Sequence, residues 1–208
     1  MEDYLDENEQ WQHVVAWLRE QGPWVLGTVV VVLAGFAGWR AWQARTERQD
    51  LTAAARYEQV LEAFSRNDIA GGTALADQLV KQYPSTPYAD LADLAAARLA
   101  VESNQLAQAD GRLVYVLAST HDPEMKLIAR LRLARVQLAE GKADEALTTL
   151  NAVDPGAFAA RYAAVRGDVL LAKGDRTGAL KAYQAARSGA DTLDSGLLDL
   201  KINDLAHS

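Results

Sequence analysis

The chain has 208 residues, of which 50% are hydrophobic and 24% are charged, so it can bury a core and is not expected to be disordered throughout. The formal net charge of -7 argues against nucleic acid as a main partner, because phosphate binding requires a basic face. The sequence contains no cysteine, which excludes disulfides, thiolate catalysis and zinc sites with cysteine ligands.

Residues 1–20 form the first predicted segment. It is rich in acidic residues and has a single arginine, so it lacks the basic start of a cleaved signal peptide and we expect it to be retained. Four apolar residues follow the i, i+3, i+4, i+7 spacing of one helix face, which predicts a short amphipathic helix. These residues are Trp11, Val14, Val15 and Leu18.

Residues 21–42 are predicted to form one transmembrane anchor. No charged residue lies between Glu20 and Arg40, and nineteen residues of helix extend about 28 Å, close to the thickness of the bilayer hydrocarbon. Tryptophans at both ends of this run suit the two membrane interfaces. A buried core helix in a soluble protein is the alternative interpretation. The residues expected to contact membrane lipid are Trp24, Val29, Val30, Val31, Val32, Leu33 and Trp39.

Residues 43–66 are charged and carry no capping signal, which predicts a connecting helix that follows the anchor. Within twenty residues of the uncharged run, Arg19 precedes it and four arginines, Arg40, Arg45, Arg48 and Arg56, follow it. The positive-inside rule taken alone therefore places the following domain in the cytoplasm. Because that rule was calibrated on short loops, these residues leave the orientation of a long domain open.

Residues 67–192 are predicted to form an all-α solenoid of about three to four helix pairs, similar to tetratricopeptide repeats. One pattern occurs twice at a distance of 33 residues, close to the 34-residue tetratricopeptide period. It consists of a small residue in the first helix, glycine at the turn, alanine at the helix crossing and a large residue four positions later. The two copies are Ala134, Gly141, Ala146 and Leu150, and Gly167, Gly174, Ala179 and Tyr183.

Two weaker copies precede this pair. One has Ala97 and Ala109 with Asn104 at the turn, and a more degenerate one surrounds Leu75 and Leu79. An irregular helical bundle is the alternative interpretation. Helix breaks are expected at turn-forming residues, namely Asn67-Asp68, 84–87, Ser103-Asn104, 121–123 (with Asp122 as the N-cap before Pro123), Gly141, 154–156, Gly174-Asp175 and Asp191.

Residues 193–208 are predicted to form a C-terminal capping helix. Leu198, Ile202 and Leu205 share one face of that helix. A cap of this kind covers the apolar surface that the last repeat of a solenoid otherwise exposes.

A partner-binding groove is predicted on the face formed by the first helices of the repeats, since stacked helix pairs leave a concave surface. If the small residues of the pattern are equivalent, the groove-facing residues that follow them are Arg98, Arg135 and Asp168. Two arginines in such a groove are suited to hold carboxylates or backbone carbonyls of an extended peptide. Ordinary solvated surface or pairing within the chain is the alternative interpretation.

No catalytic or cofactor motif is found in the sequence, and we expect neither enzyme activity nor a bound metal or cofactor. His13, His121 and His207 are far apart, and no spacing of the HExxH type occurs. The sequence also lacks GxSxG, GxGxxG and a phosphate-binding loop, because the glycine-rich stretch 71–73 has no following lysine.

Several short motifs, in the same order along essentially the whole chain, resemble the YfgM family of tetratricopeptide-like inner-membrane proteins of Gram-negative bacteria. Residues 50–95 match only in their helical pattern. The motifs are Tyr4 with 7–10, Gly38-Trp39-Arg40-Ala41-Trp42, 131–138, Arg166-Gly167-Asp168 with 170–175, and Lys201-Ile202-Asn203-Asp204-Leu205.

The resemblance implies a single-pass protein of the bacterial inner membrane with a cytoplasmic N-terminus and a periplasmic repeat domain. It implies association with the SecYEG translocon and with the membrane-anchored periplasmic chaperone PpiD, and help for exported unfolded proteins as they leave the translocon. A role in stress control through the response regulator RcsB is also implied. Two alternatives are a membrane-bound regulator that sequesters a response regulator through its acidic N-terminus, and a cytoplasm-facing tetratricopeptide receptor.

Overall fold

A computed structural model describes residues 7–189 and 195–206, although in the first helix the side chains of residues 7–16, 18–23, 25 and 26 are not described. Over these ranges the chain forms nine α-helices and one short 3-10 helix, with no strand. In chain order the elements are α1 (Glu7–Ser65), α2 (Ile69–Gln82), α3 (Pro87–Glu102), α4 (Leu106–Ser119), α5 (Pro123–Ala139), α6 (Ala143–Asn151), η1 (Gly156–Phe158), α7 (Ala159–Ala172), α8 (Arg176–Gly189) and α9 (Ser195–Ala206).

The chain divides into two compact units, Met1–Gln49 and Asp50–Ser208. In the first unit, α1 runs through the segments predicted as amphipathic helix and anchor, and its apolar residues 29–33 are exposed. Among the described residues, none of the helices combines the length and the apolarity needed to cross a membrane. The predicted anchor at 21–42 includes residues 21–23, 25 and 26, whose side chains lie outside those described, and it stays a prediction.

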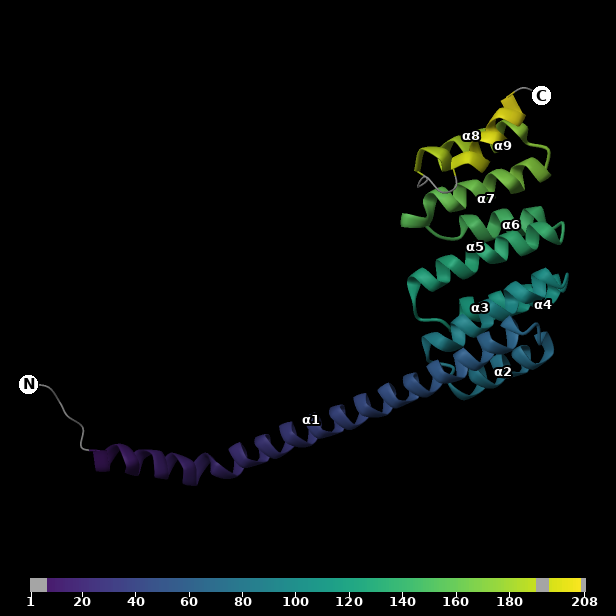
Figure 1. Cartoon of the computed structure of the whole chain (residues 1–208). Coiled ribbons are helices and arrows are strands. Elements are labelled where there is room, and N and C mark those ends of the chain that lie inside the picture. The colour runs from purple at the N-terminus through teal and green to yellow at the C-terminus, as the bar shows by residue number, and fades with distance from the viewer. Residues whose placement is uncertain (1–6, 190–194, 207–208) are drawn as a thin grey trace, which may run out of the picture. The chain divides into compact units, whose positions relative to one another are not determined.

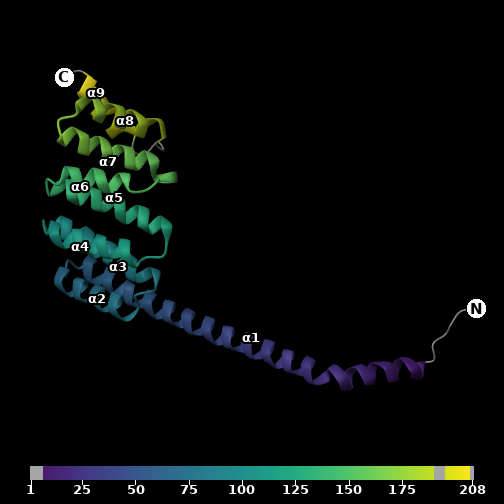
Figure 2. The same ribbon diagram turned by 180° about the vertical axis from the view of Figure 1, so that it is seen from behind.

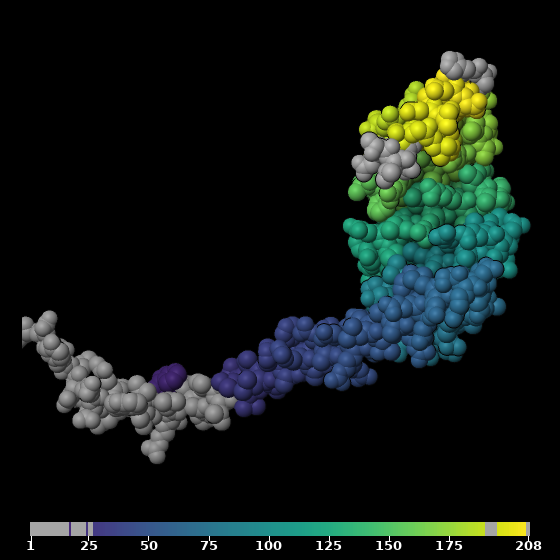
Figure 3. Space-filling model, in the orientation of Figure 1, coloured from purple at the N-terminus to yellow at the C-terminus, as the bar shows by residue number. Residues whose placement is uncertain are grey.

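The second unit is a stack of helix pairs, as the sequence predicts. The end of α1 pairs with α2, and the pairs α3–α4, α5–α6 and α7–α8 follow in order, with α9 packed on α8 (Figures 1 and 2). The first helices of successive pairs are also neighbours, since α3 contacts α5 and α5 contacts α7. In the space-filling view the atoms of successive helix pairs lie against one another on the face that is shown (Figure 3).

Each pair turns at one residue in the left-handed backbone conformation. The φ angles are 62° at Asn67, 58° at Asn104, 80° at Gly141 and 81° at Gly174. Asparagine and glycine adopt this conformation more easily than other residues, which explains why they occupy these turns. The four turns lie 37, 37 and 33 residues apart. Counting from each turn residue identifies the equivalent positions in all four pairs.

Small residues at equivalent positions let the helices of a pair cross closely, as predicted. Gly167 shows why, because a Cβ added there would lie 2.4 Å from the ring of Tyr183. The equivalent residues are all buried, and seven of the eight are glycine or alanine, the exception being Val60. Those in first helices are Val60, Ala97, Ala134 and Gly167, and those in second helices are Gly72, Ala109, Ala146 and Ala179.

The second unit begins earlier than the predicted start of the repeats at residue 67. Ala53, Val60 and Ala63 in α1 are at most 3% exposed, and Ala53 and Val60 belong to a core cluster with Ala76 and Leu79 of α2. The end of the segment predicted as a connecting helix is therefore the first helix of the first pair. Its contacts are made by apolar residues on one helix face. The prediction of a connecting helix over residues 43–66 rests on their charged residues and takes no account of this apolar face.

The predicted helix ends and the cap agree with the structure where it describes them. Seven of the eight expected breaks fall between helices, and the eighth, Asp191, lies outside the described residues. Asp122 caps α5, accepting hydrogen bonds from the backbone N–H groups of Glu124 at 2.8 Å and Met125 at 3.2 Å. Leu198, Ile202 and Leu205 of α9 pack on the core of α7 and α8, as expected of a capping helix.

Candidate partner-binding site

The three residues predicted for the groove occupy one equivalent position in successive first helices. Arg98 of α3, Arg135 of α5 and Asp168 of α7 each lie six residues before the left-handed residue of their pair. Lys201 of α9 lies 33 residues after Asp168 and continues the series. We call these four residues the groove positions.

Arg98 and Arg135 line the same pocket, between α3 and α5, with a volume of about 320 Å³. Its lining comes from α3, α4 and α5, so the pocket exists only once two successive pairs have stacked. Apart from the charged side chains, the lining is apolar and consists of Ala97, Val101, Leu113, Val136 and Ala139.

A third arginine, Arg132, lines the pocket beside them. One of its guanidinium N–H groups donates to the backbone carbonyl of Leu94 in α3, at a distance of 3.4 Å. Partial burial, together with the positive charges of Arg135 and Arg98, lowers the pKa of the Arg132 guanidinium. Arginine nevertheless stays charged at any physiological pH, so the three cations repel one another in the pocket.

The only carboxylate in the pocket lining, within the part of the chain that the structure describes, is that of Glu102. It accepts a hydrogen bond from Arg98 Nε at 2.8 Å, one helical turn away, and both side chains are more than half exposed. No carboxylate of the described residues forms an ion pair with Arg132 or Arg135. The pocket therefore carries an excess of positive charge in a chain whose net charge is negative.

Asp168 has a different environment and does not line this pocket. Tyr183 donates its hydroxyl hydrogen to Asp168 Oδ1 at 2.7 Å, and the ammonium group of Lys201 donates to the same oxygen. The Lys201 nitrogen also lies 5.2 Å from the centre of the Tyr183 ring. The structure thus brings two of the three predicted residues together and pairs the third within the chain.

Sequence reasoning missed Arg132 and Lys201. Arg132 lies three residues before Arg135 on the same helix face, a spacing that points to it once Arg135 is selected. Lys201 follows from extending the 33-residue period by one more step. Neither residue belongs to the small-residue pattern from which the groove was predicted.

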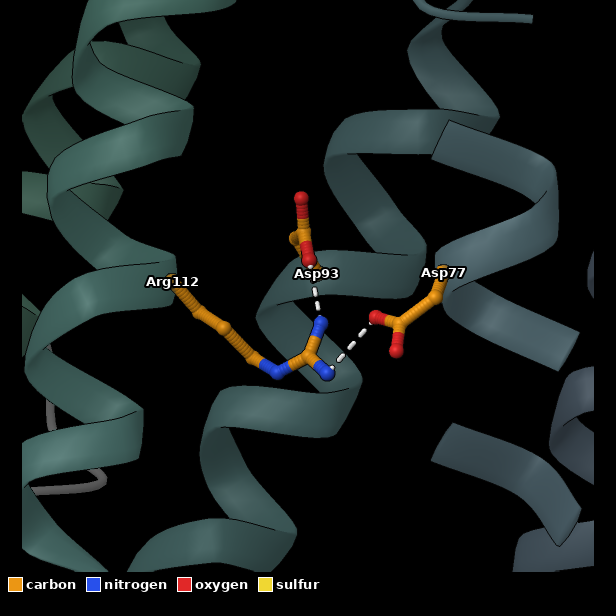
Figure 4. Close-up of polar contacts among 3 residues, drawn as sticks. All are labelled: Asp77, Asp93 and Arg112. Atoms are coloured by element: carbon orange, nitrogen blue, oxygen red, sulfur yellow. Dashed lines mark hydrogen bonds and ion pairs between the residues drawn. The ribbon is translucent and has the colours of Figure 1, made fainter. Parts of the chain in front are cut away.

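A second pocket, of about 610 Å³, shows how the same domain neutralises a buried arginine. Arg112 of α4 donates to Asp93 of α3 at 2.7 Å and to Asp77 of α2 at 2.8 Å, so that it joins three helices (Figure 4). Burial raises the pKa of the Asp93 carboxyl, although Arg112 acts in the opposite direction. The guanidinium of Arg112 therefore has two carboxylates, in contrast to those of Arg132 and Arg135, which form no ion pair with the described residues.

No metal site is suggested by the described residues, in which no group of three or more histidine, cysteine, aspartate or glutamate side chains is arranged to hold an ion. The α3–α5 pocket offers positive charge and apolar surface. Its arginines provide several N–H donors in planar groups that match a carboxylate.

Comparisons with known proteins agree with this architecture. A family described as a tetratricopeptide repeat-like domain matches residues 15–207. A crystal structure of a tetratricopeptide repeat protein from Parabacteroides merdae is similar in fold, with a TM-score of 0.54 and 14% identity over 74% of this chain and 58% of that one.

Three relatives carry the name ancillary SecYEG translocon subunit. The protein from Escherichia coli is 33% identical over 99% of this chain and 100% of its own length. Those from Aggregatibacter actinomycetemcomitans and Haemophilus influenzae are 31% and 30% identical, each over 97% of this chain and 98% of its own length. With its helical repeats and this similarity over nearly the whole length, the chain belongs to the YfgM family of ancillary SecYEG translocon subunits.

Proposed function

We propose that this protein is an ancillary subunit of the Sec translocon that scaffolds a periplasmic chaperone and assists the release and folding of exported proteins. One observation carries the proposal, namely the similarity, over nearly the full length, to relatives named ancillary SecYEG translocon subunit. The proposed partners are SecYEG, the chaperone PpiD and exported unfolded chains. The stacked helix pairs support this role because a solenoid offers a long surface to other polypeptides.

In this proposal, residues 21–42 hold the protein in the inner membrane. The uncharged run between Glu20 and Arg40 supports this part of the proposal, since its length matches the bilayer hydrocarbon. The exposure of residues 29–33, with Trp24 79% and Trp39 55% exposed, also supports it, because a contiguous exposed apolar surface requires a partner or a membrane. An anchor beside the channel raises the local concentration of the repeat domain, so that weak contacts with emerging chains become useful.

The function proposed for the repeat domain is binding and not catalysis. Its side chains hold one another in ion pairs and caps, as at Asp122 and Arg112, in ways that stabilise helices and their stacking. In the proposed arrangement the N-terminus is cytoplasmic and the repeat domain periplasmic.

Copurification tests the main proposal. The tagged full-length chain, expressed in a Gram-negative host and extracted in mild detergent, is expected to retain SecY, SecE and SecG. A variant in which residues 21–42 are replaced by the membrane span of an unrelated single-pass protein is still attached to the membrane, and it shows whether these residues themselves are needed for copurification. If the wild-type chain does not copurify with SecY, SecE and SecG under these conditions, the proposal is contradicted.

A second candidate function is a cytoplasm-facing receptor, which the four arginines on the C-terminal side of the uncharged run favour. Protease added to spheroplasts distinguishes the two. Digestion of the repeat domain from outside is expected for the translocon subunit, whereas complete protection of an intact chain would favour the receptor.

A further inference from the structure

We propose that the pocket between α3 and α5 binds an extended segment of a partner polypeptide through a carboxylate side chain, held by Arg98, Arg132 and Arg135, with a neighbouring apolar side chain on the pocket floor. The proposal rests on the proposed function for the presence of polypeptide partners, and it adds the chemical class of the segment that is bound.

Charge is the first argument for an anionic occupant. Three arginines line the pocket against the single carboxylate of Glu102, and the repulsion among them is unfavourable in the unoccupied protein. An incoming carboxylate relieves that repulsion and forms charge-assisted hydrogen bonds, which are about twice as strong as neutral ones. Because Arg98 and Arg135 line one pocket from different helix pairs, an anion bound in that pocket lies close to both of these helices.

The ion pair between Lys201 and Asp168, two of the groove positions, indicates which anion fits the pocket. Lys201 and Asp168 occupy the same position in α9 and α7 that Arg135 and Arg98 occupy in α5 and α3. There Lys201 binds the carboxylate of Asp168 within the chain. Arg98 binds the carboxylate of Glu102, one helical turn away, in the same way. At both positions the anion that the cation binds is therefore a carboxylate side chain.

The apolar floor is the second argument, because it requires more than an isolated anion. Val101 is 41% exposed, while Leu113 and Val136 lie buried beneath the pocket. A pocket of about 320 Å³ accommodates one large or two small side chains and is at the lower end of the range for ligand sites, roughly 300–1,000 Å³. Inorganic phosphate or a bare carboxylate would leave this floor in contact with water.

Glu102 has a defined place in the proposal as a competitor. Its ion pair with Arg98 is exposed and therefore weak, and an incoming carboxylate can displace it without disturbing the core. Removing its charge should tighten binding, whereas removing the arginines should weaken it. Opposite effects from two neighbouring side chains are not expected of a surface that is merely solvated.

The test uses the full-length chain in nonionic detergent and two synthetic peptides, identical except for one residue. Each is an acetylated and amidated dodecapeptide of glycine and serine with a central Leu-Glu-Leu or Leu-Gln-Leu sequence, so that the glutamate carboxylate is the single charge by which the two differ. Isothermal titration calorimetry measures affinity, and a photo-crosslinking residue next to the central position locates the contact. The glutamate peptide is expected to bind more tightly, with crosslinks to α3 and α5, and to bind more weakly as salt rises.

Four variants define the site. Replacing both Arg132→Gln and Arg135→Gln should weaken binding of the glutamate peptide about tenfold or more, as loss of charge-assisted bonds requires. Glu102→Gln should tighten it by about twofold. The matched controls are Arg66→Gln and Glu62→Gln, which alter another exposed pair of the same i, i+4 type in the second unit, and neither should change binding. Thermal unfolding of each variant verifies that it is folded.

Equal affinity for the two peptides, or unchanged binding by the double arginine variant, would overturn the proposal. Binding of phosphatidylglycerol vesicles that depends on Arg135, without binding of the peptide, would assign the pocket to a lipid headgroup and would overturn it as well. The failure of this proposal is distinguishable from failure of the proposed function. In the first case peptide binding is lost while the wild-type chain still copurifies with SecYEG, and in the second the copurification itself fails.

Discussion

The two ends of the row of groove positions differ in how their charges are satisfied. At the C-terminal end Asp168 and Lys201 neutralise each other beside the hydroxyl of Tyr183. At the N-terminal end Arg98 and Arg135 carry the same charge and share a pocket with Arg132. At the C-terminal end the two groove charges neutralise each other, whereas at the N-terminal end Arg98 is paired only with Glu102 on its own helix and Arg135 has no ion pair among the described residues.

The difference follows from position in the stack. The pair α7–α8 is covered by the single helix α9, whose apolar residues pack on it, and the ion pair of Lys201 with Asp168 also joins α9 to α7. In the middle of the stack the neighbouring pairs already cover each other. Arg98 and Arg135, at the groove positions of α3 and α5, are the side chains for which we propose a partner.

The largest expected effect is at the closed end. Tyr183→Ala should lower the free energy of unfolding by about 3–5 kcal/mol, because the fully buried ring fills the space between α7, α8 and α9. Chemical denaturation followed by circular dichroism measures this. Tyr115→Ala, at a tyrosine that is 45% exposed, is the control and should change stability by less than about 0.5 kcal/mol. Equal effects of the two would contradict the packing described for the last pair.

A second prediction concerns the internally neutralised arginine in the N-terminal part of the domain. Arg112→Met should cost about 2–4 kcal/mol at neutral pH, because it leaves the Asp93 carboxylate, whose side chain is 5% exposed, buried without its cation. Arg66→Met, in an exposed pair, is the control and should cost less than about 0.5 kcal/mol.

The Arg112 variant also predicts a pH dependence. The pKa of Asp93 is already raised by burial in the wild-type chain, and loss of Arg112 removes an influence that lowers it. A carboxyl whose folded pKa exceeds its unfolded value destabilises the fold above the folded pKa, and this penalty disappears as pH falls toward the unfolded value of about 3.9. The stability difference between Arg112→Met and wild type should therefore narrow from pH 7 to pH 4. A difference that widens instead would contradict this account of Asp93.

A smaller effect is expected from charge reversal at the closed end. Lys201→Glu places a second carboxylate beside Asp168 and should destabilise the docking of α9 by about 1 kcal/mol, since both side chains are about one-third exposed. Hydrogen exchange of the α9 amides, compared with those of α5, measures the loss. Lys201→Arg keeps the charge and should leave exchange nearly unchanged. Equal protection of α9 in all three chains would mean that apolar contacts alone hold it.

The smallest effect is expected at the open end. Arg135→Gln should change the free energy of unfolding by less than about 0.5 kcal/mol and should not destabilise the fold, because it reduces repulsion with Arg132. Thermal unfolding of the variant and the wild type tests this. A loss above about 1 kcal/mol would show that the open end is held together by its arginines, and the comparison between the two ends would no longer stand.

Much of the fold could be predicted from the sequence because its signals are local. Gly141 and Gly174 mark turns that need the left-handed conformation, and Ala134 and Gly167 mark close crossings, so their spacing defines the repeat without knowledge of distant contacts. In the first pair, the copy around Leu75 and Leu79 was predicted but its first helix was not. That helix is the end of α1, whose buried face is recognised only from its contacts with α2.

The candidate site could be predicted only in part. Periodicity placed Arg98, Arg135 and Asp168 in one row, but it does not indicate which of them have partners. Asp168 is paired because Lys201 and Tyr183 reach it from α9 and α8, and these contacts join residues 33 and 15 positions away.

The sequence by itself determined the helical class, the period, the turns and the capping helix, because helix propensity, small residues and turn residues act over a few neighbouring positions. Only the tertiary structure decided where α1 joins the stack, which groove charges are neutralised and that three arginines share one apolar pocket. These properties depend on which helix faces meet, and burial and Coulomb interactions between distant residues arise only after the pairs have packed.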